Sequence, residues 1–473
     1  MSEALRVDES VLLRLAGAGP RYTSYPTAPE WTDDFGPADA LDAAVRASAE
    51  TDEPLSLYVH LPFCTRLCLY CGCTVEIHGK QSRADAYLDA VEREIEIVSA
   101  ALGDRRDVLQ MHWGGGTPTF LSVEQLQRMY GLVTDRFRFL PGAEISLEVD
   151  PHVTTHEQVD ALMDLGFNRV SMGVQDLDPH VQEVVRREQT AEETDALVTR
   201  CRERGVEGLN MDLMYGLPDQ TEAGFGNTLD EIVRLAPDRL AVFGYAHVPW
   251  MKPAQKALET RGTMPGPTER ARLFGLAIEK LGAAGYEVIG LDHFAKADDP
   301  MARALHEGTL HRNFMGYALA PTEDMVAFGM SAIGELAGTF VQNARTTAEY
   351  ESALADGKLA TIRGLRRSPE DELRRAVILS LMCRMRIDLD ELEQETGRSG
   401  LAEHFAREWT ELRPFAEEGF CDLGERRLDV TPTGRLFLRH MAMPFDEHLR
   451  RRRAEAAAKE AAGEDGPRFS QTI

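Results

Sequence analysis

The chain has 473 residues, 43% of them hydrophobic, and a formal net charge of −26 at pH 7. This length is too great for one ordinary domain and suits a barrel-like domain with a smaller domain beside it. The strong negative charge argues against nucleic acids and anionic membranes as partners.

Neither a membrane span nor an export signal is predicted. No run of about 18 apolar residues occurs, and the start Met-Ser-Glu-Ala-Leu-Arg lacks an apolar signal core. The seven cysteines, three of them closely spaced, suit a reducing compartment better than a disulfide scaffold. We therefore predict a cytoplasmic protein.

The first informative stretch is Pro20-Arg-Tyr-Thr-Ser-Tyr-Pro-Thr27. Two prolines and several hydroxyl side chains do not suit a helix, so an extended segment is predicted. A linker is the plain alternative, but tyrosines and an arginine are unusual in a linker.

From residue 55 to about 295 the chain alternates short apolar runs with amphipathic stretches, a pattern typical of βαβ units. The predicted strands are Ser56–Leu61, Val108–Trp113, Glu144–Val149, Arg169–Val174, Gly208–Met214, Arg239–Tyr245 and Glu287–Leu291. The predicted helices are Ala84–Ala101, Val123–Phe137, Glu157–Leu165, Glu192–Arg204, Thr228–Leu235 and Glu269–Ala284. Such a run forms a parallel barrel or an open doubly wound sheet, and the pattern does not decide between them.

A group of cysteines follows the first predicted strand. Cys64, Cys68 and Cys71 have the spacing C-x3-C-x2-C, Pro62 ends the strand before them, and Cys73 follows after one more residue. Three close thiolates favour an iron–sulfur cluster, in which one iron would keep an open coordination position. The alternatives are a zinc knuckle, which needs a fourth Cys or His, and incidental buried cysteines.

Glycines and polar residues follow the next strands. Gly114-Gly-Gly-Thr-Pro-Thr119 lets a ligand approach bare backbone, whereas a phosphate-binding loop would need Gly-Lys-Ser/Thr and no lysine is near. Glu148, Gln175 and Asp212 end the three strands after it, at the edge where a barrel collects its site. Each could be a hydrogen-bonded core residue, but together they favour a shared pocket.

The pattern changes in the last third of the chain. Residues 296–345 are less regular and contain Leu310-His-Arg-Asn-Phe-Met-Gly-Tyr317. After Pro369 come predicted helices and a hairpin-like stretch, in the order Glu372–Met385, Asp388–Thr396, Glu403–Glu418, Phe420–Val430 and Pro432–Met443. This order resembles a winged helix; because the chain is acidic, a lid or docking module is favoured over DNA binding. A solvated helix at Arg453–Ala462 and a frayed tail complete the prediction.

The cysteine spacing, with Tyr70 directly before the last cysteine, resembles the signature of the radical S-adenosylmethionine (SAM) enzymes. The wider context, Tyr58-x-His60-x-Pro62-Phe-Cys and Cys71-Gly-Cys73, resembles one family among them, the oxygen-independent coproporphyrinogen III oxidases. The resemblance covers the chain from Pro20 to about Arg450.

This resemblance implies an α/β fold with an incomplete (β/α)6 barrel, open on one side to admit a large substrate. It also implies a C-terminal, mostly helical, winged-helix-like domain. The implied division has residues 1–50 as an extended segment and helices covering the barrel mouth, 51–345 as the partial barrel, 346–450 as a lid domain, and 451–473 as a charged flexible tail.

The resemblance further implies a set of site residues. Cys64, Cys68 and Cys71 would hold a [4Fe-4S] cluster, and Tyr58 and His60 are the catalytic candidates. Arg187, predicted on a helix beside Arg186, matches an arginine that pairs with a SAM carboxylate. The other candidates for binding SAM are Tyr58, Tyr70, Gly115, Gly116, Thr117, Glu148, Gln175, Asp212, Ala246 and Ile333, of which Ala246 and Ile333 would act largely through backbone.

Three other cysteines, Cys201, Cys383 and Cys421, are predicted to be small buried hydrophobic residues. The role of Cys73 stays open, because its shorter spacing suits a cluster ligand poorly.

The implied activity is the oxidative decarboxylation of two propionate side chains of coproporphyrinogen III to vinyl groups, giving protoporphyrinogen IX in haem biosynthesis. Two SAM molecules would be consumed per turnover. The implied partners are the tetrapyrrole substrate and an electron donor such as a flavodoxin or ferredoxin, with the chain acting as a monomer.

Two alternatives stay open. One is a haem-binding chaperone on the same scaffold, although such relatives generally lack the Arg-Tyr-Thr-Ser-Tyr-Pro-Thr segment and the Cys-Gly-Cys ending. The other is a radical SAM enzyme, such as a methyltransferase, acting on another substrate. It is kept because the family commonly reads Asn-Phe-Gln-Gly-Tyr-Thr-Thr-Gln where this chain has Asn313-Phe-Met-Gly-Tyr-Ala-Leu-Ala320, so Met315 and Ala318–Ala320 make a polar edge apolar.

Overall fold

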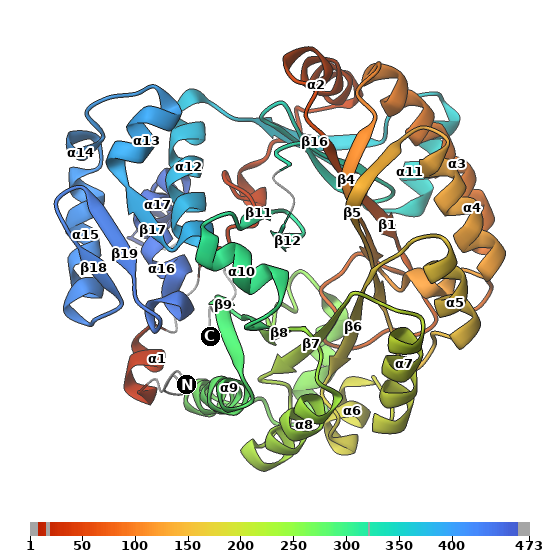
Figure 1. Ribbon diagram of the computed structural model, residues 1–473, viewed down its shortest axis with the longest axis horizontal. Helices are drawn as coiled ribbons and strands as arrows, with labels where there is room; N and C mark the ends of the chain where they lie inside the picture. The colour runs from red at the N-terminus through yellow and green to blue at the C-terminus, as the bar shows by residue number, and fades with distance from the viewer. Residues whose placement is uncertain (1–7, 16–18, 320–321, 462–473) are drawn as a thin grey trace.

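The structure, a computed structural model, describes residues 8–15, 19–319 and 322–461 (Figure 1). Its centre is a curved sheet of twelve strands in the order β16-β15-β14-β13-β1-β4-β5-β6-β7-β8-β10-β9. Six neighbouring strands are parallel: β1 (Leu55–Leu61), β4 (Asp107–Gly115), β5 (Arg138–Val149), β6 (Arg169–Gln175), β7 (Gly208–Tyr215) and β8 (Arg239–Gly244). The order runs from β16 to β9 without closing, so the predicted partial barrel of six main strands is confirmed.

Helices connect the parallel strands along the outer side of the sheet, as Figure 1 shows. They are α3 (Arg83–Ala101), α4 (Val123–Thr134), α5 (His156–Asp164), α6 (Pro179–Val185), α7 (Ala191–Glu203) and α8 (Glu222–Leu235). Three of them begin at capping boxes, in which the N-cap residues Ser122, Thr155 and Thr190 accept a backbone N–H three residues on. A Gln or Glu at that third position returns the bond, so the sequence itself fixes where these helices start.

The strand faces explain why the inside of the barrel is polar. In β6, Val170, Met172 and Val174 are buried, and they alternate with partly exposed residues, as expected for a strand with two different faces. The alternate residues Arg169, Ser171, Gly173 and Gln175 line a cavity. The apolar core therefore lies between sheet and helices, and the inner face is left for a ligand.

Both ends of the parallel set carry additional strands. Next to β1 lie β13 (Met325–Phe328), which is parallel to it, and then the antiparallel strands β14 (Ile333–Leu336), β15 (Thr339–Asn343) and β16 (Thr361–Arg366). Residues 296–345, which showed no regular pattern in the sequence, thus contribute strands to the sheet. The sheet also extends beyond residue 345, the predicted end of the barrel, to Arg366.

Next to β8 lies β10 (His293–Lys296), which is antiparallel to it, and then β9 (Tyr286–Gly290), which is antiparallel to β10. The strand predicted at Glu287–Leu291 therefore exists but does not continue the parallel series, because the turn after Gly290 sends the chain back between β8 and β9.

Smaller elements surround this sheet. They are α1 (Glu9–Leu15), η1 (Ala28–Glu30), α2 (Pro37–Glu50), β2 (Phe63–Cys64), β3 (Glu76–Ile77), η2 (Pro118–Phe120), η3 (Pro253–Thr260), α9 (Pro267–Ala283), α10 (Pro300–Glu307), β11 (His311–Asn313), β12 (Gly316–Ala318) and α11 (Thr347–Ala355).

The C-terminal part, drawn in blue in Figure 1, combines helices with a three-stranded antiparallel sheet ordered β17-β19-β18. Its elements are α12 (Pro369–Arg384), β17 (Arg386–Asp388), α13 (Leu389–Thr396), α14 (Leu401–His404), α15 (Ala406–Glu417), β18 (Cys421–Leu423), β19 (Arg427–Val430), η4 (Gly434–Phe437), α16 (Leu438–Ala442), η5 (Met443–Phe445) and α17 (Glu447–Ala461). The helical character and the hairpin are confirmed, whereas β17 was not predicted and the helix predicted at Glu403–Glu418 is divided at Phe405.

This C-terminal part protects the open edge of the barrel. Leu291 N–H donates to the carbonyl of Arg435 at 3.0 Å, and Arg435 Nη1 donates to Val288 O at 3.1 Å, so η4 lies against the outermost strand β9. An edge strand covered in this way cannot pair with another chain.

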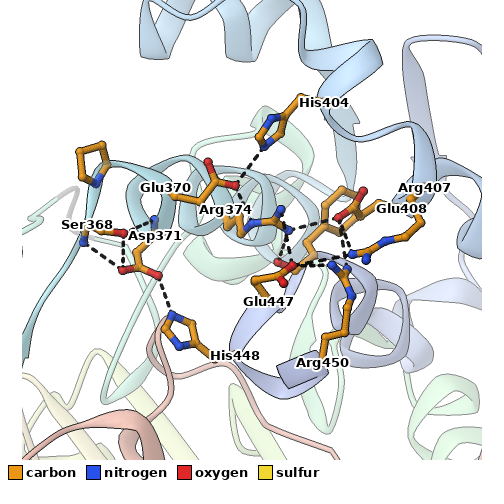
Figure 2. Close-up of polar contacts among 12 residues, drawn as sticks. Ser368, Glu370, Asp371, Arg374, His404, Arg407, Glu408, Glu447, His448 and Arg450 are labelled. Carbon is orange, nitrogen blue, oxygen red and sulfur yellow. Dashed lines mark hydrogen bonds and ion pairs between the residues drawn. The ribbon is translucent and has the colours of Figure 1, made fainter. Parts of the chain in front are cut away.

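Ion pairs hold the C-terminal helices together (Figure 2). The buried carboxylate of Glu408 lies 3.2 Å from nitrogens of Arg374, Arg407 and Arg450, which come from α12, α15 and α17. Because a buried carboxylate needs partners, this cluster fixes the three helices relative to one another.

The extended segment near the N-terminus is anchored to the same helices. Tyr22 Oη donates to Asp446 Oδ2 at 3.1 Å, and the N–H of Glu447 donates to Tyr25 Oη at 3.3 Å. His448 Nε2 lies 2.7 Å from Asp371 Oδ1, and its Nδ1 lies 3.5 Å from Glu30 Oε2.

Among the described residues, no helix is both long and apolar enough to cross a membrane.

Candidate active site

The cysteine loop begins where β1 ends. After Pro62, β2 pairs with β3 and closes a loop between them. Cys64 is the last residue of β2, and Cys68, Cys71 and Cys73 lie in the loop. Cys64, Cys68 and Cys71 are partly exposed, Cys73 is exposed, and all four line one cavity of about 450 Å³.

Polar groups contact two of the thiols. Thr117 Oγ1 lies 3.6 Å from Cys64 Sγ, and Arg187 Nη1 donates to Cys68 Sγ at 3.7 Å. Burial raises the pKa of Cys64 to about 12, whereas a hydrogen bond with Cys73 lowers the pKa of Cys71 to about 6. A nearby guanidinium and hydroxyl suit thiolates, the form in which cysteine binds metals.

Three thiols on one loop, facing a polar cavity, fit an iron–sulfur cluster as a donor set. In the part of the chain that the structure describes, no three His, Cys, Asp or Glu side chains are gathered closely enough to hold a single metal ion. The fit therefore rests on the shared loop and cavity, and not on a ready-made site for one ion.

The glycine-rich stretch at the end of β4 packs tightly under this loop. Gly115 has a φ of +108°, and a Cβ there would lie 2.4 Å from the ring of His60. A Cβ at Gly116 would lie 2.6 Å from the carbonyl carbon of Pro62. These two glycines are therefore required by the close approach of two protein segments, besides leaving backbone open toward the cavity.

The predicted strand-end residues Glu148, Gln175 and Asp212 all line the cavity. Glu148 accepts the N–H of Gly115 at 3.1 Å. Burial, aided by the charge of Glu148, raises the pKa of Asp212 to about 7. Gln175 has a left-handed backbone with φ +68°, and its buried Oε1 has no hydrogen-bond partner among the described residues. An unsatisfied amide oxygen that faces a cavity can accept a hydrogen bond from a bound ligand.

Arg187 also lines the cavity, but not from a helix as predicted. Helix α6 ends at Val185, and Arg186 caps it in a left-handed conformation with φ +56°. This turn leaves Arg186 exposed and directs Arg187 inward, where Nη1 lies 3.2 Å from Asp150 Oδ2 and Nη2 donates to Gly173 O.

Tyr70 and Thr117 complete the predicted residues that line the cavity. Tyr58, His60, Ala246 and Ile333 are not among its lining residues. Tyr58 Oη and His60 Nδ1 are 3.1 Å apart, and His60 Nε2 lies 2.9 Å from Thr74 O, so this pair lies behind the glycine stretch. Burial lowers the pKa of His60.

One wall of the cavity was missed by sequence reasoning. Phe243 at the end of β8, His293 in β10 and Tyr317 in β12 pack edge to face, with ring centroids 6.0 Å and 5.3 Å apart. Met315 lines the cavity beside Tyr317, whereas Ala318 is buried and Ala320 lies outside the described residues. Only Phe243 lay in a predicted strand, so periodicity gave no signal for the other two.

Comparison with known proteins gives two family models. Residues 58–232 match the radical SAM superfamily, and residues 368–437 match the HemN C-terminal domain.

Several named proteins resemble the chain over nearly its whole length. Oxygen-independent coproporphyrinogen III oxidase of Salmonella typhimurium is 42% identical, over 94% of this chain and 96% of that protein. The protein of the same name from Pseudomonas aeruginosa is 41% identical, over 95% and 97% of the two chains. The solved structure of coproporphyrinogen III oxidase from Escherichia coli, described as a radical SAM enzyme, superimposes with a TM-score of 0.88 at 41% identity, over 94% of this chain and 100% of that one.

Proposed function

This chain belongs to the family of oxygen-independent coproporphyrinogen III oxidases, and from that premise we propose that it converts two propionates of coproporphyrinogen III to vinyl groups. Each conversion removes one hydrogen atom, CO₂ and one electron, and the product is protoporphyrinogen IX. The observation that carries the proposal is that the three thiols share one cavity with the glycine stretch and with polar residues from three strand ends.

The cofactors of this family are a [4Fe-4S] cluster and SAM, which together supply the oxidant that removes hydrogen from an unactivated C–H bond. Cys64, Cys68 and Cys71 would hold three irons and leave the fourth open. The depressed pKa of Cys71 favours the thiolate form needed there, and Arg187 donates to Cys68. At Cys64 burial opposes that form, and the Thr117 hydroxyl offsets only part of the effect.

The residues around the cavity would bind and orient SAM. Arg187 presents a planar guanidinium suited to a carboxylate, and its position is fixed by Asp150 and by Gly173 O. Glu148, Gln175 and Asp212 offer hydrogen-bonding groups at the strand ends. Gly115, Gly116, Thr117, Tyr70, Ala246 and Ile333 complete the proposed contacts, for two SAM molecules per turnover.

Tyr58 and His60 are better explained as positioning residues. The His60 ring lies directly under Gly115, where even a methyl group would not fit, and Tyr58 is hydrogen-bonded to that ring. We therefore propose that both residues fix the position of the glycine stretch at the cavity and do not contact the reacting atoms. With its open side covered, the cysteine-lined cavity would exclude water from the chemistry.

Two further features belong to the proposal. An electron donor such as a flavodoxin or ferredoxin would reduce the site, and the chain would act as a monomer. The C-terminal helices and the segment at 20–27 would form a lid over the open side.

The test is anaerobic turnover of the reconstituted enzyme with coproporphyrinogen III, SAM and a reductant, followed by oxidation and separation of the porphyrins. We expect protoporphyrin, with two SAM cleaved per molecule formed. SAM cleavage without a vinyl product would assign the chain to another substrate, and tight haem binding without SAM cleavage would assign it to the chaperones.

The variant Met315→Gln tests the departure from the family pattern in the same assay. Met315 lines the cavity, and a glutamine would add one hydrogen-bonding group worth about 0.5–1.5 kcal/mol net. We expect activity to be kept or raised. Abolished turnover would show that methionine at this position is needed for the reaction.

A further inference from the structure

A group of arginines packs against Phe243 and Tyr317, which together with His293 line one wall of the cavity. The guanidinium carbon of Arg21 lies 5.2 Å from the centroid of Phe243, and that of Arg312 lies 4.6 Å from the centroid of Tyr317. The extended segment at 20–27 thus brings its arginine to the rim of the cavity.

Arg439 belongs to the same group. It comes from α16, is only 7% exposed, and is close enough to Arg21 and Arg312 for their charges to oppose its own. No hydrogen bond or ion pair joins its guanidinium to another side chain in the part of the chain that the structure describes.

Among the described residues, one carboxylate, that of Asp292, forms an ion pair with a member of this group. Asp292 Oδ2 lies 3.0 Å from Arg21 Nη1, and Asp292 Oδ1 lies 2.9 Å from His293 Nδ1. Although burial opposes its ionisation, Arg21 and the other neighbours hold the pKa of Asp292 far below its usual range.

Part of the hydrogen-bonding capacity of Arg312 is also unused. Arg312 donates through Nε to Tyr22 O and through Nη2 to Arg21 O, both at 3.2 Å, while its buried Nη1 has no partner among the described residues. Buried cations without partners are costly, so an excess of positive charge inside a chain of net charge −26 calls for an anion from outside.

We propose that Arg21, with the positive charges of the buried Arg312 and Arg439 behind it, forms a subsite that binds a carboxylate of the tetrapyrrole, on a propionate other than the one reacting. This inference rests on the proposed function, which makes the substrate a polycarboxylate. The guanidinium fork matches a carboxylate, and the wall of Phe243, His293 and Tyr317 offers an apolar face to a pyrrole ring.

Arg21 is the group best placed to meet the ligand. Its side chain is 41% exposed, whereas Asp292 and the other two arginines are buried behind it. A plain structural role is the alternative, since the Arg21–Asp292 pair also fastens the extended segment to the barrel.

The test measures binding of coproporphyrin III, the stable oxidised form of the substrate, by fluorescence titration under anaerobic conditions. Arg21→Gln should bind it about tenfold more weakly than wild type, while the neutral tetramethyl ester binds both proteins equally. SAM affinity and iron content should not change. An equal loss for the acid and the ester, or no loss for either, would overturn the proposal.

The variant Asp292→Asn distinguishes binding of the ligand by Arg21 from anchoring of the extended segment to the barrel. It breaks the same ion pair but leaves the guanidinium free, so the proposal predicts kept or raised affinity for coproporphyrin III. A fastening role instead predicts the same loss in Asp292→Asn as in Arg21→Gln, and that result would contradict the subsite.

The matched control is Arg272→Gln, which breaks another ion pair between the N-terminal region and the barrel, at 2.8 Å from Glu9. It lies at an exposed position and should leave porphyrin binding unchanged. Failure of wild type to turn over coproporphyrinogen III would overturn the proposed function, whereas turnover by wild type with unaltered binding in Arg21→Gln would overturn only the subsite.

Discussion

Of the four thiols that line the cavity, the three proposed cluster ligands differ from Cys73 in what their loss would do. We expect Cys64→Ala, Cys68→Ala and Cys71→Ala each to abolish the cluster, because three irons need thiolate ligands. Cys73→Ala should keep it. Iron counting and visible absorption after anaerobic reconstitution measure both outcomes.

The contact between Cys73 and Cys71 makes the Cys73→Ala variant an informative control. Cys73 hydrogen-bonds Cys71 and lowers the pKa of that residue, so Cys73→Ala removes an aid to ionisation without removing a proposed ligand. A colourless Cys73→Ala protein, or a fully loaded Cys68→Ala protein, would overturn the assignment.

Arg186 and Arg187 are adjacent but face opposite surroundings. Arg187 is buried against Asp150 and Cys68, whereas Arg186 is exposed at the helix end. Truncating one partner of a buried charge pair costs about 2–5 kcal/mol, so Arg187→Ala should weaken SAM binding by roughly 30-fold or more. Arg186→Ala should change it little, and equal SAM affinities by equilibrium dialysis would refute the role of Arg187.

Residue type and spacing were enough to bring together much of the site. The cysteines and the strand-end residues Glu148, Gln175 and Asp212 line one cavity, because parallel strands place their carboxyl ends at one edge. Arg187 came only from family resemblance, since its inward direction depends on the left-handed turn at Arg186, which ends the helix before the position at which it was predicted to lie.

At the scale of elements, the loop between β13 and β14 depends on one glycine. Gly329 has a φ of +101°, and a Cβ there would lie 2.5 Å from both His60 O and Tyr87 Oη. Its N–H donates to the buried Glu94 at 2.7 Å. Gly329→Ala should therefore lower the free energy of unfolding by roughly 2–4 kcal/mol, through backbone strain and overlap together.

Gly142→Ala is the matched control, measured by the same denaturant titration. Gly142 also has a positive φ, +81°, but nothing lies within 4 Å of the added Cβ, so only the strain of about 1–2 kcal/mol should appear. Equal losses in the two variants would show that the loop can move away from β1.

The elements themselves were predictable where strand and helix patterns alternate. All six parallel strands were predicted. Strand β5 begins at Arg138 and not at Glu144 as predicted, because Pro141 and Gly142 interrupt the strand pattern in its first half. Strand β13 was missed since it has four residues and finds its partner β1 more than half the chain away. Pairing over such a distance leaves no local signal.

At the scale of the whole molecule, His448 joins the two ends of the chain. Its ring contacts Asp371 of α12, as Figure 2 shows. On the other side it contacts Glu30 beside the extended segment, and two residues before it Asp446 accepts a hydrogen bond from Tyr22. The same extended segment, residues 20–27, places Arg21 at the rim of the cavity, where it contacts Asp292. This segment therefore connects the C-terminal helices to the cavity.

The charge of His448 makes this link dependent on pH. Hydrogen bonds to Asp371 and then to Glu30 raise its pKa to about 9 from 6.5. A raised pKa means that the folded state holds the proton more tightly, so the contribution is fully present below about pH 6.5 and is lost as pH rises through about 9. Since the imidazole is partly solvated, we expect a loss of about 1–2 kcal/mol.

The measurement is the unfolding midpoint of wild type and His448→Gln between pH 6.5 and 9.5. Wild type should lose roughly 2 °C or more relative to the variant over that interval, because only wild type has a proton to release at this position. Thiols and other groups that titrate in this range are common to both proteins and cancel in the difference. His306→Gln, which removes an exposed pair with Glu287 on another face, should follow the wild-type curve. Parallel curves for wild type and His448→Gln would show that the two chain ends are held together by the Tyr22 and Tyr25 contacts without help from this charge.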